Sequence, residues 1–360
     1  MKHLFKSLAA LSITCGAAVA QWVLTPGSPT TNTFEAHDLS NTPFCPNGPG
    51  IGVSSKTIIA GNTTGLWSRC GQGPWTALVT GQPVSSWFVT AAGAIVYAQL
   101  APAAQGQPGP SVEPITLLTG PGATPKPSTY QADVRRLALN RTSGTMYALQ
   151  VDGSVFVSTD GLNWAASNPQ THFVHANAIG GLAVGPDGGV TVCDEVEPCE
   201  KLLNGAWTNI GVGNNSNAVF FTPDGSAWDC DSNNSPRKWD GAQTWNPVAI
   251  AGFTFRCHFA LNIGTSTYLV GRDISDSGSP GPHVYVSQNN GASWSPFETG
   301  LTIAAGGEGQ SLGLDCTGTL YMGTDQPPGP GAGIFSQASV GPNVCGGAPP
   351  GGSVLTITVP

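Results

Sequence analysis

Three carboxylates, Asp231, Asp273 and Glu308, are the side chains with which this chain is best equipped to do chemistry. Each stands beside an apolar, β-branched or aromatic run that predicts a short strand, at a point from which it can face the centre of the fold. Two carboxyl groups at a suitable separation can act as general acid and as base or nucleophile when a glycosidic bond is broken. We therefore take these three as candidate catalytic residues of a glycan-cleaving enzyme, either a glycoside hydrolase or a polysaccharide lyase.

Five basic side chains fall near the same predicted strand ends and are candidate substrate-binding residues: Arg136, His175, Arg256, His258 and Arg272. Arginine presents a planar set of donors that suits an acidic or hydroxyl-rich sugar. An enzyme should gather such residues in one central pocket, whereas a lectin should repeat one aromatic and polar set along the chain. Outside the turn motifs below we find no such repetition, which favours the enzyme and leaves a non-catalytic carbohydrate-binding protein as the alternative.

An acidic segment between Cys193 and Cys199 contains Asp194, Glu195 and Glu197. Clustered carboxylate oxygens can bind calcium, but the spacing of an EF-hand is absent. The segment is better explained as an acidic loop closed by a disulfide. We therefore expect no cofactor, with calcium near these three residues as the alternative.

Tryptophan recurs at a spacing that predicts how the chain is built. Trp164, Trp207, Trp245 and Trp294 are separated by 43, 38 and 49 residues, and Trp75 precedes Trp164 by 89, about two such periods. Repeats of about 40 to 50 residues are typical of four-stranded propeller blades. The predicted fold is all-β, a single seven-bladed β-propeller of four-stranded antiparallel blades, with six or eight blades as alternatives.

The tryptophans close a repeated turn, found at Ser68–Trp75, Ser158–Trp164, Lys238–Trp245 and Ser287–Trp294. These turns resemble the Asp-box, the Ser-x-Asp-x-Gly-x-Thr-Trp hairpin of sialidases and related β-propellers. The resemblance covers the hairpins only, and the full-length copy has Asn289 in place of Asp. It implies a propeller and says little about chemistry, because such hairpins occur in proteins of unrelated function.

A sialidase is a minor alternative within that resemblance. Sialidases bind the carboxylate of sialic acid with three arginines, which Arg136, Arg256 and Arg272 would supply here. The Arg-Ile-Pro motif of that family is absent, and its six blades differ from the seven expected. The resemblance therefore favours another glycan-active propeller.

Both ends of the chain differ from the repeats. Residues 1–20 combine Lys2, His3 and Lys6 with an apolar stretch and an Ala18-Val19-Ala20 site, as a secretory signal peptide does. Residues 21–345 are assigned to the propeller and the Gly- and Pro-rich residues 346–360 to a tail. The last repeat breaks after three strands, so we expect the strand at Trp22–Leu24 to pair with Ile334–Ser336 and close the ring.

Export is also indicated by the eight cysteines that follow the signal segment, which favour four disulfides. Sequence alone leaves the pairing open, and we expect Cys193–Cys199, Cys230–Cys257, Cys316–Cys345 and Cys45–Cys70. Acceptor sequons for N-glycosylation occur at Asn62, Asn140, Asn214 and Asn233. The predicted location is therefore extracellular, and the protein a secreted glycoprotein.

Charge is scarce: 9% of residues are charged, with 13 basic against 21 acidic side chains, where about 25% is usual. This balance excludes binding to nucleic acid through phosphate neutralisation. No segment after the signal has the length and hydropathy of a membrane span. Strand direction places most carboxylates on the face opposite the turn motifs, so we expect a central acidic pocket there, a carbohydrate partner, no nucleic acid or membrane partner, and a monomer.

Overall fold

The computed structural model describes seventeen segments of the chain. They are residues 21–26, 57–62, 65–70, 73–81, 84–90, 92–99, 113–120, 122–150, 152–171, 181–193, 198–212, 216–231, 235–250, 254–273, 283–303, 308–324 and 333–343. The predicted signal segment and the predicted tail lie outside these residues. No helix in the described segments is long and apolar enough to cross a membrane.

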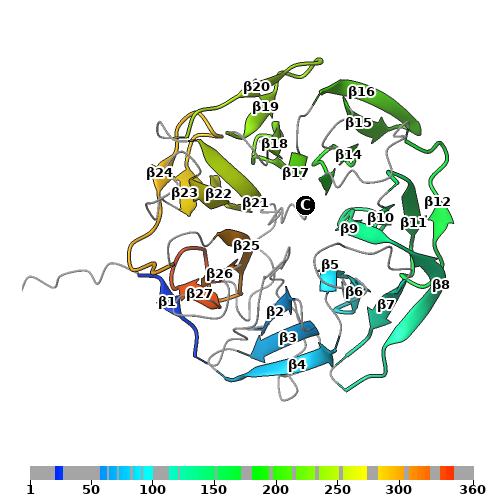
Figure 1. Cartoon of the computed structure of the whole chain (residues 1–360), viewed down its shortest axis with the longest axis horizontal. Coiled ribbons are helices and arrows are strands. Elements are labelled where there is room, and N and C mark those ends of the chain that lie inside the picture. The colour runs from blue at the N-terminus through cyan, green and yellow to red at the C-terminus, as the bar shows by residue number, and fades with distance from the viewer. Residues whose placement is uncertain are drawn as a thin grey trace, which may run out of the picture.

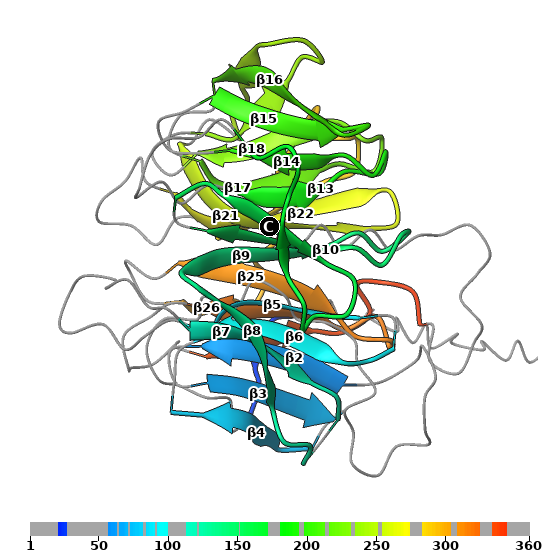
Figure 2. The same cartoon turned by 90° about the vertical axis from the view of Figure 1, so that its right-hand side faces the viewer.

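Antiparallel sheets are arranged around a central axis as the blades of a β-propeller (Figure 1), and Figure 2 shows the same blades from the side. In each four-stranded blade that follows the chain order, the first strand lies innermost and the fourth lies at the rim. The first three such blades consist of β5 (Val84–Val89), β6 (Ile95–Gln99), β7 (Glu113–Leu118) and β8 (Lys126–Ala132); β9 (Val134–Leu139), β10 (Met146–Gln150), β11 (Val155–Ser158) and β12 (Ala165–Ala166); and β13 (Leu182–Val184), β14 (Val190–Val192), β15 (Pro198–Leu203) and β16 (Ala206–Val212).

Two further blades have the same order. They consist of β17 (Ser216–Phe221), β18 (Ala227–Asp231), β19 (Arg237–Trp239) and β20 (Trp245–Pro247); and of β21 (Phe255–Ile263), β22 (Ser266–Asp273), β23 (Val284–Ser287) and β24 (Ser295–Pro296). The sixth four-stranded blade takes its strands from both ends of the chain: β25 (Gly309–Leu314), β26 (Leu320–Thr324), β27 (Ile334–Gln337) and β1 (Val23–Leu24).

The strand β1 is the fourth strand of that last blade. Val23 pairs with Ser336 and Leu24 with Phe335, which is the pairing expected from the sequence. Trp22 is buried against Phe297 of the preceding blade, to whose carbonyl its indole N–H donates over 2.9 Å. The N-terminal strand therefore joins two neighbouring blades as well as completing one.

The prediction of seven four-stranded blades is wrong: the described residues form six of them. The remaining described strands, β2 (Thr57–Asn62), β3 (Gly65–Cys70) and β4 (Trp75–Thr80), form a three-stranded sheet between the blades of β25 and β5 (Figure 1). Trp75 opens β4 as Trp245 opens the fourth strand β20, and β2 contacts β5 of the next blade.

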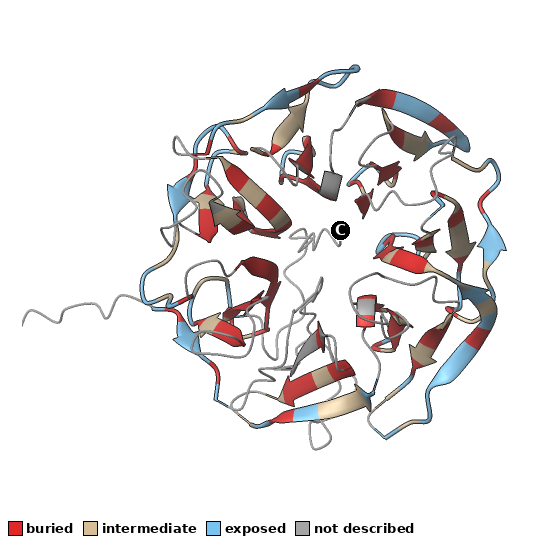
Figure 3. Cartoon of the chain, in the orientation of Figure 1, coloured by how far each residue is buried: buried red, intermediate tan, exposed pale blue. Residues whose placement is uncertain are grey.

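Burial explains why these short segments form strands. The innermost strands are almost wholly buried and the rim strands are largely exposed (Figure 3). Every residue of β25 and β26 is buried, because both faces of an inner strand pack against neighbouring blades. Apolar runs without strict alternation are expected where both faces of a sheet are covered.

The repeated turns owe their shape to one short polar side chain. Asp160 Oδ1 accepts hydrogen bonds from the N–H groups of Leu162 and Asn163, each 2.8 Å away. Asn289 accepts one from Ser293 in the same manner, so Asn replaces Asp without loss of the turn. A glycine with positive φ follows each time, at Gly161 and Gly291.

Two of the predicted disulfides are present: Cys193–Cys199, within one blade, and Cys230–Cys257, between β18 and β21. Cys70 and Cys316 are also disulfide-bonded. Cys45 and Cys345, which we expect to be their partners, lie outside the described residues.

The sequon at Asn140 lies in a tight turn and is 9% exposed. Its side-chain oxygen accepts hydrogen bonds from the backbone of Thr142 and Ser143 at 3.0 and 3.1 Å. In the folded protein this side chain therefore stabilises the turn through these two hydrogen bonds. The side chains of the other three sequon asparagines lie outside the described residues.

Candidate functional site

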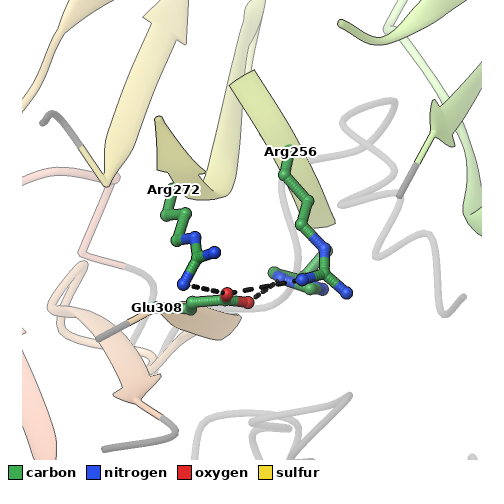
Figure 4. A network of polar contacts seen from close by, with 4 residues as sticks. Arg256, Arg272 and Glu308 are labelled. Carbon is green, nitrogen blue, oxygen red and sulfur yellow. Dashed lines mark hydrogen bonds and ion pairs between the residues drawn. The ribbon is translucent and has the colours of Figure 1, made fainter. Parts of the chain in front are cut away.

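A cluster of four polar side chains lies where two inner strands begin: Arg256, His258, Arg272 and Glu308 (Figure 4). Arg256 and His258 belong to β21, and Arg272 is near the end of β22 in the same blade. Glu308 directly precedes β25, the inner strand of the next blade. We call this group the Glu308 cluster. It lies at the end of the strands opposite the repeated turns, on the face where the sequence places most carboxylates.

The two arginines are directly opposite each other in the β21–β22 register. Their guanidinium groups converge on one carboxylate: Arg272 Nη1 lies 2.8 Å and Arg256 Nη1 3.5 Å from Glu308 Oε1. Like charges opposite each other on neighbouring strands repel, so the carboxylate between them offsets an unfavourable pair.

His258 contacts the other carboxylate oxygen of Glu308: its Nε2 lies 2.5 Å from Glu308 Oε2. The β21–β22 register shifts between Cys257 and Phe259, which identifies a β-bulge at His258. A bulge adds one residue to a strand and re-aims the side chains around it. Arg256 and His258 are two residues apart on β21 and therefore share one face of the strand, from which both contact Glu308 of the next blade.

Glu308 is ionised in this setting. Burial would raise the pKa of its carboxyl, but the hydrogen bond from His258 and the charges of His258, Arg256 and Arg272 outweigh it and hold the pKa below 4.5. The Glu308 side chain is 8% exposed, against 33% for Arg256 and 35% for Arg272. The cluster is thus a buried carboxylate under two partly exposed guanidinium groups.

Two glycines allow neighbouring strands to pack closely at the Glu308 cluster. A Cβ on Gly271, which is opposite Cys257, would lie 1.9 Å from the carbonyl oxygen of Arg256. One on Gly309, next to Glu308, would lie 2.2 Å from Val270 Cγ2. Glycine therefore allows β22 to approach β21 at Gly271 and β25 to approach β22 at Gly309.

A disulfide anchors the same strand. Cys257 stands between Arg256 and His258 and is bonded to Cys230 of the preceding blade. Both cysteines are fully buried. The strand that supplies two of the four side chains is therefore held from one side by a covalent bond and from the other by Glu308.

The other predicted site residues are not part of this described group. Asp273 and Asp231 end β22 and β18, at the same end of the blades, but their side chains lie outside what the structure describes. Arg136 is on β9, and the blades of β13 and β17 lie between it and β21. His175 and the acidic segment at Asp194, Glu195 and Glu197 fall outside the described residues.

No group of three or more potential metal-ligating side chains occurs in the described part of the chain. The described cluster also differs in sign from the acidic pocket that the sequence suggests, because three basic side chains surround a single carboxylate. Sequence reasoning selected all four residues but missed the bulge at His258. Gly271 and Gly309 are the local sequence signals of a close strand approach here.

The arrangement can do two things chemically. Guanidinium groups that are partly exposed can donate hydrogen bonds to a carboxylate or hydroxyl group of a ligand. An ionised carboxylate and an imidazole in contact can hold or move a proton, and the carboxylate can act as a nucleophile. Fold and cluster together define a β-propeller with a polar site at the inner end of two blades.

No protein-family model matches the sequence, and no curated protein matches it. Solved structures match the fold. YCF48 bound to D1 peptide has a TM-score of 0.57 at 14% identity, covering 89% of this chain and 96% of that chain. The WD40 β-propeller domain of Doa1 has a TM-score of 0.58 at 12% identity, covering 89% and 97%.

The GH74 enzyme of Niastella koreensis has a TM-score of 0.59 at 15% identity, covering 86% of this chain and 53% of that chain. These neighbours include a peptide complex and a glycoside hydrolase. At such low identity they establish that this chain has the β-propeller fold, and that fold serves unrelated functions.

Proposed function

We propose that this protein is a secreted glycan-cleaving enzyme, a hydrolase or a lyase of the Asp-box propeller type, whose substrate binds over the Glu308 cluster. The observation that carries the proposal is the convergence of Arg256, His258 and Arg272 on one buried carboxylate in a chain with few charges. Ionisable groups with perturbed pKa values that gather at one point are typical of functional sites. A GH74 enzyme among the fold neighbours is compatible with this proposal.

The state of Glu308 restricts its role. An ionised carboxylate cannot donate a proton, so Glu308 fits a base or a nucleophile and not a general acid. Asp273 and Asp231, at the same end of β22 and β18, are the candidates for the acid. His258 is the other group that can move a proton within the cluster. Arg256 and Arg272 orient the sugar.

A non-catalytic carbohydrate-binding protein is the second candidate, and one observation favours it. Both oxygens of Glu308 already have partners, Oε1 the two arginines and Oε2 the imidazole. A carboxylate so engaged must give up a partner before it attacks a substrate. The same cluster can bind a sugar through its arginines without any such change.

Secretion is part of the proposal. The signal-like segment at residues 1–20 supports it, and so do two disulfides in the described residues. Disulfides persist in oxidising compartments and are rare in the cytosol.

The test is a panel of polysaccharides, assayed for new reducing ends and for unsaturated products, with Glu308→Gln and Asp273→Asn as site variants. Asp240→Asn is a matched control, because Asp240 lies in a repeated turn at the other end of the strands and Asn289 shows that Asn keeps such a turn. We expect turnover by the native protein and the control and its loss in the site variants. Full turnover in both site variants would remove these residues from the mechanism. Sugar binding without turnover would establish the second candidate, and no interaction with any glycan would refute the proposal.

A further inference from the structure

The short segment from Trp22 to Thr25 joins three neighbouring sheets. Trp22 donates its backbone N–H to the carbonyl of Thr299, which follows β24, over 2.9 Å. Thr25 donates its hydroxyl to the carbonyl of Ile334 on β27 over 2.8 Å, and it accepts a hydrogen bond from the indole of Trp75 on β4 over 3.3 Å. The segment thus connects the blade of β21, the last blade and the three-stranded sheet.

Gln21 directly precedes this segment and is the first residue that remains after cleavage at the predicted Ala18-Val19-Ala20 site. It is exposed, whereas Trp22 beside it is buried. Gln21 lies against Gly300: a Cβ on Gly300 would be 2.9 Å from Gln21 Cβ. The glycine therefore leaves space beside the glutamine side chain.

We infer that Gln21 is a modification site, and that the mature protein begins with pyroglutamate, the cyclic lactam of an N-terminal glutamine. The inference rests on the secretion proposed above. In the reaction the α-amino nitrogen attacks the side-chain amide carbon and forms a bond with it, while the bond from that carbon to the side-chain nitrogen breaks. The side-chain nitrogen leaves as ammonia with a proton from the α-amino group, so no further reactant is required.

Cyclisation is compatible with the contacts that close the ring. It changes only the α-nitrogen and the side chain of Gln21, whereas the donors to Thr299 and Phe297 are the backbone and indole N–H groups of Trp22. It also removes the positive charge of the chain terminus. Because an aminopeptidase needs a free α-amino group, the lactam protects the segment that joins the three sheets from stepwise removal.

The experiment is mass spectrometry of the protein recovered from the medium of cells that secrete it, after reduction, alkylation and digestion with trypsin. The first tryptic peptide of a chain that starts at Gln21 ends at Lys56. We expect the mass of this peptide to be lower than that of the unmodified sequence by one ammonia, with fragment ions that place the loss on residue 21. Edman degradation of the intact protein should release no first residue.

Gln21→Ala is the control, because alanine cannot form the lactam. Its first peptide should have the unmodified mass, and Edman degradation should release alanine. Loss of ammonia at the Asn47-Gly48 pair of the same peptide would persist in this variant, and that result would overturn the inference. A native chain that starts at Gln21 with a free amino group would also overturn it and leave secretion standing, whereas a chain that keeps residues 1–20 would refute both.

Discussion

Removing the Cys230–Cys257 disulfide should destabilise the protein more than removing Cys193–Cys199. A disulfide stabilises mainly by restricting the unfolded chain, and the effect grows with the loop that it closes. The cysteines are 27 residues apart in the first case and 6 in the second. The loop-entropy relation then gives about 3.5 kcal/mol for Cys230–Cys257 and about 2.2 kcal/mol for Cys193–Cys199, a difference of about 1.3 kcal/mol.

The assay is equilibrium unfolding in guanidinium chloride of two double variants, Cys230→Ala/Cys257→Ala and Cys193→Ala/Cys199→Ala. All four sulfurs belong to fully buried residues, so the loss of packing is similar in both variants and cancels in the comparison. We expect a lower transition midpoint for the first variant. An equal or reversed order of midpoints would show that native-state packing, and not restriction of the unfolded chain, determines what each disulfide contributes.

The remaining predictions concern the Glu308 cluster and ring closure. Glu308→Gln should destabilise the protein by about 1 to 3 kcal/mol above pH 4.5, because it removes the negative charge that both partly exposed arginines contact. Because the folded pKa of Glu308 is lowered, its contribution is present above 4.5 and lost as the pH falls below that value, so unfolding curves of variant and native protein should converge in acid. Gly271→Ala should lower the melting temperature by several degrees, since its Cβ would overlap the Arg256 carbonyl, whereas Gly120→Ala, with open space around it, should not. Trp22→Ala should cost about 3 to 5 kcal/mol in chemical denaturation, and a cost below about 1 kcal/mol would show that β1 contributes little to closing the ring.

The features that could be predicted from the sequence are those fixed by local chemistry or by strand direction. Tryptophan spacing and repeated Gly-containing turns indicated four-stranded blades, because each turn carries its own capping side chain. Strand direction alone placed Cys230 and Cys257 together. The incomplete last repeat indicated the pairing of Val23 with Ser336, which joins segments more than 300 residues apart.

The blade count failed where the sequence has no such signals. Counting the weak repeat near Ile51 to Val79 as a complete four-stranded blade relied on the ring as a whole, because the sequence leading into it is rich in Gly and Pro; the described residues form three strands there. The spacing of the tryptophans shows where a repeat lies in the sequence. It does not show that the repeat forms all four strands of a blade.

The site was predicted only in part, because strand direction can be inferred from the sequence and packing between blades cannot. Direction along the strands placed Arg256, Arg272 and Glu308 at one end of the propeller. Their convergence on a single carboxylate depends on how close β25 lies to β22, which is set by packing between blades. Packing of this kind leaves little trace in a single sequence apart from a glycine such as Gly309.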